Sequence, residues 1–167
     1  MLIDMHFDGQ TLTWNSLKFK ATTGMNKYQH PSYQCLKESG PVPEGIYHIY
    51  NTDLGTAKDD GTGKCNLSPA WGVQTIPRGR DAGNCEPYWA NWGNHRVRIE
   101  PANQKTVNAC RPRRGGFYIH DSTKGYSHGC IEVEGSFFST LRATTSRRLT
   151  IEVKYIANRP TNGGTGD

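Results

Sequence analysis

The residues best suited to chemistry are one cysteine and two histidines close to it in sequence, Cys130, His120 and His128. A thiol is a useful nucleophile only as the thiolate, so it needs a base or a positive environment nearby. Gly129 removes side-chain bulk beside the thiol and permits backbone angles that other residues resist. Backbone N–H groups at positions 129 and 130 would then face an oxyanion. The pattern predicts covalent catalysis by Cys130 with a histidine as the general base.

Two other interpretations fit a cysteine near histidines. An isolated pair of this kind is more often a buried thiol beside a surface histidine, and the same three residues could also bind zinc. The chain has no Cys-x-x-Cys or His-Glu-x-x-His spacing that would support a metal site. The longer run, Ile119-His120-Asp121 followed by a short loop and Ser127-His128-Gly129-Cys130-Ile131, is more specific. We therefore favour a nucleophile and expect no metal and no cofactor.

This run resembles the signature of the L,D-transpeptidases of the YkuD type, which act on bacterial peptidoglycan through a cysteine acyl-enzyme. The resemblance implies that Cys130 is the nucleophile, that His120 is the general base and that His128 lines the site. It also implies that the backbone carbonyl of Asp121 orients the imidazole, and that Gly129 belongs to the catalytic turn.

Four further residues are candidates for binding the substrate: Ser127, Tyr118, Arg114 and Glu132. Arginine suits bidentate recognition of carboxylates, and the arginines at 111, 113 and 114 lie close to the reaction centre in sequence. A solvated basic turn is the alternative for them. Glu132 stands two positions after the cysteine, where the family usually has Asn or Arg.

The short loop before Ser127 and the segment Gly40-Pro41-Val42-Pro43-Glu44-Gly45-Ile46-Tyr47 resemble a narrower branch. It comprises the L,D-transpeptidase-like antibacterial effectors of type VI secretion (DUF2778-like). This resemblance implies that the enzyme cuts or exchanges the bond between the diamino acid and D-Ala in peptidoglycan tetrapeptide stems. It implies secretion machinery and a cognate immunity protein as partners. Two rivals stay open: another Cys–His peptidoglycan amidase or endopeptidase, and a non-catalytic wall-binding module stapled by disulfides.

Composition favours a mainly β, β-rich α+β fold. Hydrophobic residues make up only 34% of the 167, and 19 glycines and nine prolines disfavour long helices. The resemblance implies an L,D-transpeptidase-like β-sandwich with one or two short helices. We expect residues 1–158 to form a single catalytic domain and 159–167 to be a disordered tail. The loop-rich segment 64–95 is either a lid or insert bordering the active cleft or a structural loop layer held by a disulfide. Period-two alternation predicts strands at 11–14, 17–22, 46–50, 97–100 and 148–155, and a short helix follows residue 136.

The net charge of +5 suits an anionic polymer such as a bacterial wall, although nucleic acid or a membrane surface would also suit it. The chain has no nucleic-acid motif, so we expect no nucleic-acid partner. It has no signal peptide and no stretch apolar enough to span a membrane. We expect synthesis in the cytoplasm, export without a cleaved signal, and action in the periplasm of a target bacterium.

Five cysteines give an odd number, so a free nucleophile at Cys130 leaves four, which allow three pairings. We favour Cys65 with Cys85 and Cys35 with Cys110, although the sequence does not choose among the pairings. Four reduced thiols are the alternative.

Overall fold

The computed structural model describes residues 1–167 as a mainly β fold, which confirms the predicted fold class. The strands are β1 (Met5–Phe7), β2 (Thr11–Trp14), β3 (Leu17–Thr23), β4 (Gly45–Tyr50), β5 (Asp53–Thr56), β6 (Val73–Thr75), β7 (His95–Pro101), β8 (Tyr118–His120), β9 (Ile131–Val133) and β10 (Arg148–Val153). The helices are α1 (Glu86–Trp89), α2 (Gln104–Val107) and α3 (Ser136–Arg142), with 3-10 turns η1 (Asn26–Tyr28), η2 (Pro31–Tyr33), η3 (Gly79–Asp81) and η4 (Gly83–Cys85). None of the helices has the length and apolar character needed to cross a bilayer.

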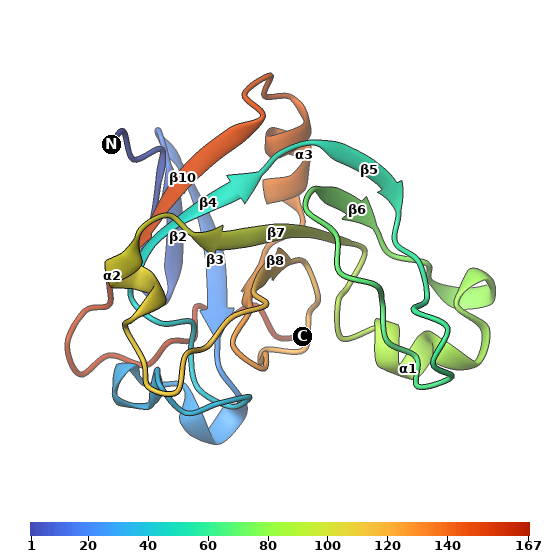
Figure 1. Cartoon of the computed structure of the whole chain (residues 1–167), viewed down its shortest axis with the longest axis horizontal. Coiled ribbons are helices and arrows are strands. Elements are labelled where there is room, and N and C mark those ends of the chain that lie inside the picture. Colours follow the sequence, from blue (N-terminus) through green and yellow to red (C-terminus); the bar gives the residue numbers. More distant parts are fainter.

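Eight of the strands close into a barrel rather than forming the two separate layers of the expected sandwich (Figure 1). Their order is β4-β10-β1-β2-β3-β9-β8-β7, and β7 pairs back to β4. Closure depends on β7, because its first residues pair with β6 whereas Ile99 to Pro101 pair with β4. The barrel therefore leaves no open edge along β4 or β7, and β6 and β5 extend outward from it.

The barrel interior is filled by alternate side chains of its strands, which belong to a cluster of 23 buried hydrophobic residues. Helix α3 covers one end and inserts Phe137, Phe138 and Leu141 into that cluster. The Phe137 ring packs edge-on against Phe19 with the ring centroids 5.6 Å apart. The apolar alternation of these short strands thus builds one continuous core, against which the strands that carry the site residues are packed.

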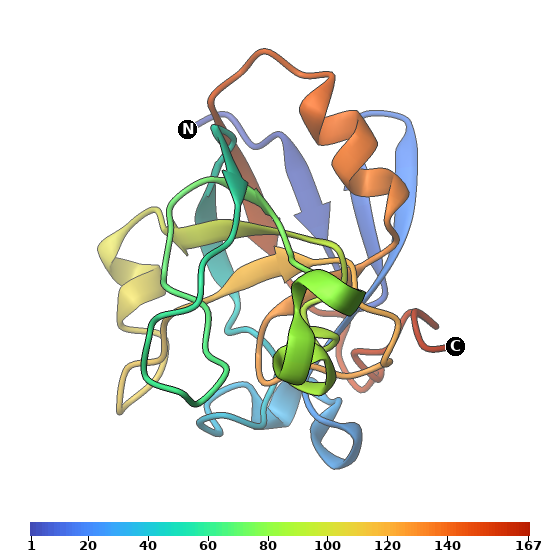
Figure 2. The same ribbon diagram turned by 90° about the vertical axis from the view of Figure 1, so that its right-hand side faces the viewer.

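The segment 64–95 leaves the barrel between β5 and β7 and has a small core of its own. Ala57, Leu67, Ile76, Ala82 and Trp89 form a second buried cluster. Figure 2 shows the loops of this segment and helix α1 lying in front of the barrel. A disulfide between Cys65 and Cys85 fastens the segment, and the Trp89 indole donates to the Cys65 carbonyl at 2.9 Å.

The structure corrects the prediction of a disordered tail at 159–167. Thr161 is fully buried, and its hydroxyl donates to the Thr23 carbonyl at 2.6 Å. Further along, the Thr165 hydroxyl donates to the buried carboxylate of Glu132. The tail is polar and has no periodicity, but its threonines supply hydrogen bonds that β3 and Glu132 need. Composition alone does not report such pairing.

Candidate active site

Parallel pairing of β8 with β9 brings the sequence motif together. Ile119 lies opposite Ile131, and both side chains enter the core. Because side chains alternate along a strand, Tyr118 and His120 lie on the other face, as does Cys130 immediately before β9. Cys130 is half-buried and is the free cysteine of the chain. The Tyr118 N–H donates to its Sγ at 3.4 Å, so the thiol is positioned from the neighbouring strand.

His120 is buried, with an exposed fraction of 3%. Its Nδ1 lies 3.1 Å from the hydroxyl oxygen of Ser122, which in turn donates to Glu132. Burial, together with the positive charge of Arg96, lowers the pKa of His120 to about 3, against a smaller opposing effect of the Trp92 carbonyl. The imidazole is therefore neutral, and able to accept a proton, throughout the physiological pH range.

The role assigned to Asp121 changes. The hydrogen bond at His120 Nδ1 is made with Ser122 rather than with the Asp121 carbonyl. The Asp121 carboxylate accepts from the backbone N–H groups of Asn94 and His95, each at 2.7 Å, and lies 2.8 Å from His95 Nδ1. Asp121 thus fixes the start of β7 behind the site.

Burial raises the pKa of the Cys130 thiol to about 11, although the Tyr118 N–H and the charges of Arg96, Arg98 and Arg114 act in the opposite direction. A neutral imidazole beside a protonated thiol is therefore the resting state that the structure favours. Any reaction in which this thiol acts as a nucleophile would therefore require its proton to leave as the new bond forms.

His128 is exposed on the outer side of the thiol. Its Nδ1 lies 2.9 Å from the Glu38 carbonyl, and a carbonyl can only accept, so Nδ1 carries the hydrogen. His128 and His120 line one cavity with Cys130.

Ser127 and Gly129 shape the turn that presents the thiol. The Ser127 hydroxyl accepts from Gly24 N–H at 3.1 Å and from Gly129 N–H at 3.3 Å, and it donates to the Cys130 carbonyl. Gly129 has φ of +118°, and a Cβ there would collide with the guanidinium of Arg114. Of the two N–H groups expected at an oxyanion, only that of Cys130 lacks a hydrogen bond. Ser127 borders the cavity, but its hydroxyl is committed to the fold.

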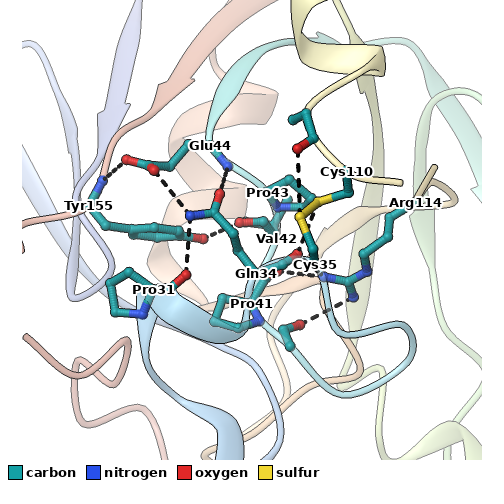
Figure 3. The surroundings of a disulfide bond; sticks show 12 residues. Pro31, Gln34, Cys35, Pro41, Val42, Pro43, Glu44, Cys110, Arg114 and Tyr155 are labelled. Carbon is teal, nitrogen blue, oxygen red and sulfur yellow. Dashed lines mark hydrogen bonds between the residues drawn. A yellow bond between two sulfur atoms is a disulfide. The ribbon is translucent and has the colours of Figure 1, made fainter. Parts of the chain in front are cut away.

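Arg114 does not line the cavity, and its guanidinium donates to main-chain carbonyls (Figure 3). Its Nη1 donates to Gln34 at 2.8 Å and to Pro41 at 2.6 Å, and Nη2 donates to Gly40 at 3.2 Å. Nη2 also lies 3.4 Å from the His128 carbonyl. The guanidinium thus joins the 34–41 loop to the thiol turn, residues 127–130, by hydrogen bonds. It is not available to a substrate carboxylate.

The carboxylate of Glu132 is completely buried and is likewise unavailable to a substrate. Its oxygens accept from two backbone N–H groups, those of Lys124 and Gly125, and from the hydroxyls of Ser122 and Thr165. This arrangement corrects its placement among the substrate-binding residues: Glu132 organises the loop between His120 and Cys130 from within.

Tyr118 is also buried rather than turned to a substrate. Its hydroxyl accepts from the Ala70 N–H at 3.1 Å and from Arg98 at 3.3 Å. What Tyr118 contributes to the site is its main-chain N–H at Cys130.

The disulfides follow the favoured pairing. Cys35 is joined to Cys110, beside the Gln34 carbonyl that Arg114 contacts (Figure 3). Cys65 is joined to Cys85 at the edge of the cavity.

The cavity at the thiol has a volume of about 430 Å³. One part of the lining is the thiol turn, residues 127–130, with Tyr126, and the other is the 64–95 segment, which the sequence predicted to border the cleft. The side chains of that second wall are Cys65, Asn66, Leu67, Tyr88, Asn91 and Trp92. No Lys, Arg, Asp or Glu lines the cavity, and no three His, Cys, Asp or Glu side chains are placed so that they could hold one metal ion. Aromatic residues in the segment were the sequence signal for this wall, whereas its two asparagines gave none.

A family model matches most of the chain. The model described as the Tlde1 domain, which is the DUF2778 family, matches residues 18–155. That range includes every residue lining the cavity at Cys130. The match supports the DUF2778-like resemblance of the motif. No curated protein matches the chain.

Proposed function

Because the chain belongs to the Tlde1 domain family, we propose that it is a cysteine-dependent peptidoglycan-modifying enzyme that type VI secretion delivers as an antibacterial toxin. The observation that carries the proposal is the meeting of Cys130, His120 and His128 in one cavity. A half-buried free thiol, a neutral buried imidazole and an unpaired N–H at the thiol are the parts that acyl transfer requires.

The proposed substrate is the tetrapeptide stem, cut or exchanged at the bond between the diamino acid and D-Ala. A cavity of about 430 Å³ is within the range of sites for small ligands. The amides of Asn66 and Asn91 and the rings of Tyr88 and Trp92 offer hydrogen bonds and apolar surface to the end of a peptide.

In the proposed mechanism His120 takes the thiol proton as Cys130 Sγ attacks the carbonyl carbon, forming a C–S bond. The oxyanion accepts from the Cys130 N–H, a contact worth about 2.7–4 kcal/mol in well-studied sites. The C–N bond then breaks, and the amine of D-Ala leaves with the proton from His120. Water or the amine of another D-amino acid then attacks the thioester carbonyl and gives a proton to His120. The C–S bond breaks, and the leaving thiolate takes that proton from His120.

The test is mass spectrometry of purified tetrapeptide muropeptides after incubation with the protein, with and without a free D-amino acid. We expect loss or replacement of the terminal D-Ala, and no product with Cys130→Ala. His120→Ala should lower the rate by at least about 100-fold, the scale of general-base catalysis. His6→Ala, at an exposed histidine paired with Glu152, is the matched control and should leave the rate unchanged.

Each rival predicts a different product. An amidase would separate the stem from the glycan, and an endopeptidase would cut a cross-link, each with the tetrapeptide end intact. A binding module would sediment with purified wall material and release nothing. Unchanged tetrapeptide ends with folded protein would therefore refute the L,D-specific proposal.

The toxin proposal has its own test. Expression directed to the periplasm of a susceptible bacterium should halt growth or distort cell shape, and Cys130→Ala should abolish the effect. Normal growth with the unaltered protein present in the periplasm would contradict it. A cognate immunity protein is expected to restore growth.

A further inference from the structure

Arg96, on β7, is a buried arginine with no carboxylate partner. Its exposed fraction is 1%. Nε donates to the Gln74 side-chain oxygen at 2.8 Å, and Nη2 donates to the Ser68 carbonyl at 2.6 Å. The guanidinium lies between two aromatic rings, 4.3 Å from the centroid of Tyr118 and 4.6 Å from that of Trp92. All of these partners are neutral, and none of the ion pairs in the structure includes Arg96.

A buried charge without a counter-charge costs several kcal/mol in real proteins. The neighbouring Arg98 does not bear this cost, because its guanidinium lies 2.6 Å from the Glu100 carboxylate. If Arg96 served only to fill space in the core, its charge would therefore lower the stability of the fold. A neutral side chain of similar length would fill the same space at lower cost, so its charge calls for an explanation.

The position of Arg96 relates that charge to the candidate active site. Arg96 lies directly opposite His120 in the antiparallel register of β7 and β8. The two residues whose rings enclose its guanidinium also contact the thiol and the imidazole, Tyr118 through its backbone N–H and Trp92 through its ring. Tyr118 donates its N–H to the Cys130 sulfur, and Trp92 packs edge-on against the His120 ring with centroids 5.5 Å apart.

We propose that Arg96 is a positioning residue for the cysteine chemistry, whose buried charge, held beside the thiol and the imidazole by Tyr118 and Trp92, stabilises the Cys130 thiolate as its proton leaves. This inference rests on the proposed function for its catalytic meaning. Arg96 does not touch the substrate, because it is buried and does not line the cavity.

The ionisation of both groups agrees with this role, since the charge of Arg96 lowers the pKa of His120 and opposes the rise in the pKa of Cys130. The other charged or titratable groups around the pair are Arg98, Arg114, Tyr88, Tyr118, Tyr126, His128 and Glu132. Among the cations, Arg98 is balanced by Glu100, and Arg114 is partly solvated. Arg96 is the one cation that is both fully buried and unbalanced.

The test is the rate of alkylation of Cys130 by iodoacetamide as a function of pH, with the modified residue identified by mass spectrometry. Arg96→Gln should raise the midpoint of the pH–rate profile by about one unit or more, which is at least about tenfold in rate at a fixed pH below the midpoint. Arg96→Lys keeps the positive charge, so its midpoint should lie close to that of the wild-type protein. Arg98→Gln is the control and should shift the midpoint less.

Gln74→Glu is the sharper variant, because it keeps Arg96 in place and puts a carboxylate against its guanidinium. If only the shape of Arg96 matters, this change leaves the midpoint where it is or strengthens the packing. If the charge matters, the midpoint rises as in Arg96→Gln. Gln74→Glu also provides the answer if Arg96→Gln fails to fold.

A wild-type midpoint in folded Gln74→Glu, or an equal shift in Arg98→Gln, would overturn the inference. Alkylation needs no muropeptide, so the two proposals fail separately. A shifted midpoint without any change in muropeptides would support the role of Arg96 and refute the proposed substrate.

Discussion

Replacing Glu132 by glutamine should destabilise the fold while leaving substrate affinity unchanged. Each carboxylate oxygen accepts from one backbone N–H and one hydroxyl. A hydroxyl can rotate and accept from the new NH₂ group, whereas a backbone N–H cannot. In either amide orientation, therefore, the N–H of Lys124 or of Gly125 is left facing another donor.

The size of the effect follows from those contacts. An unsatisfied buried N–H costs about 1–3 kcal/mol, and the remaining bonds lose their charge assistance. We expect Glu132→Gln to lower the free energy of unfolding by about 2–4 kcal/mol. Urea unfolding with the disulfides intact measures it. Glu134→Gln is the matched control, because its carboxylate is less buried and accepts from one N–H, that of Lys20 at 3.0 Å, and it should cost less than about 1 kcal/mol.

The opposite pattern would refute this reasoning. If Glu132 binds substrate, Glu132→Gln would raise the KM for muropeptides and leave the free energy of unfolding within about 0.5 kcal/mol of the wild-type value. A destabilised protein with an unchanged KM supports the structural role.

Three further predictions concern the turn and the cavity. His120 must be neutral to act as a base, and its pKa lies at about 3, so kcat/KM should stay constant as the pH falls below 6 and drop only near that pKa. A pH–rate profile whose acid limb lies near 6.5 would contradict this. Gly129→Ala should lose activity in the muropeptide assay and lower the Tm, because a Cβ at φ +118° collides with Arg114. Joint replacement of Cys65 and Cys85 by serine should lower the free energy of unfolding by about 3 kcal/mol in urea titrations. It should also reduce kcat/KM, because one wall of the cavity loosens. Unaltered kinetics would show that this wall does not need the disulfide.

The sequence was informative where the signal is local. The alternation at 148–155 predicted β10, and the aromatic residues after position 136 predicted α3, because both patterns depend on neighbouring residues. Barrel closure was not predictable, since nothing in the alternation of β4 or β7 specifies that these strands pair. The buried threonines of the tail were missed for the same reason: their partners on β3 lie far away in sequence.

The candidate site follows the same division. Cys130 and His120 stand in a recognisable motif, and the strand pairing of β8 with β9 places them on one face. Arg96 is not recognisable from sequence, because an isolated arginine in an alternating strand is usually exposed. Only burial and the absence of a carboxylate partner distinguish it.

Residues chosen for nearness to Cys130 in sequence turn out to hold the site together from inside. The charged groups of Arg114 and Glu132 form hydrogen bonds with the backbone of the protein itself, and the Ser127 hydroxyl donates within the turn to the Cys130 carbonyl. The side chains left free to meet a substrate belong mainly to the 64–95 segment, where Asn66 and Asn91 lie across the cavity from the thiol turn. Under the proposed function, reactivity would reside in the barrel strands, whereas selectivity would reside in a segment with its own small core and its own disulfide. The two parts meet where Gln74 and Trp92 of the segment contact Arg96. Only side chains away from that contact, such as those of Asn66 and Asn91, can therefore change without disturbing the ionisation of the cysteine and the histidine.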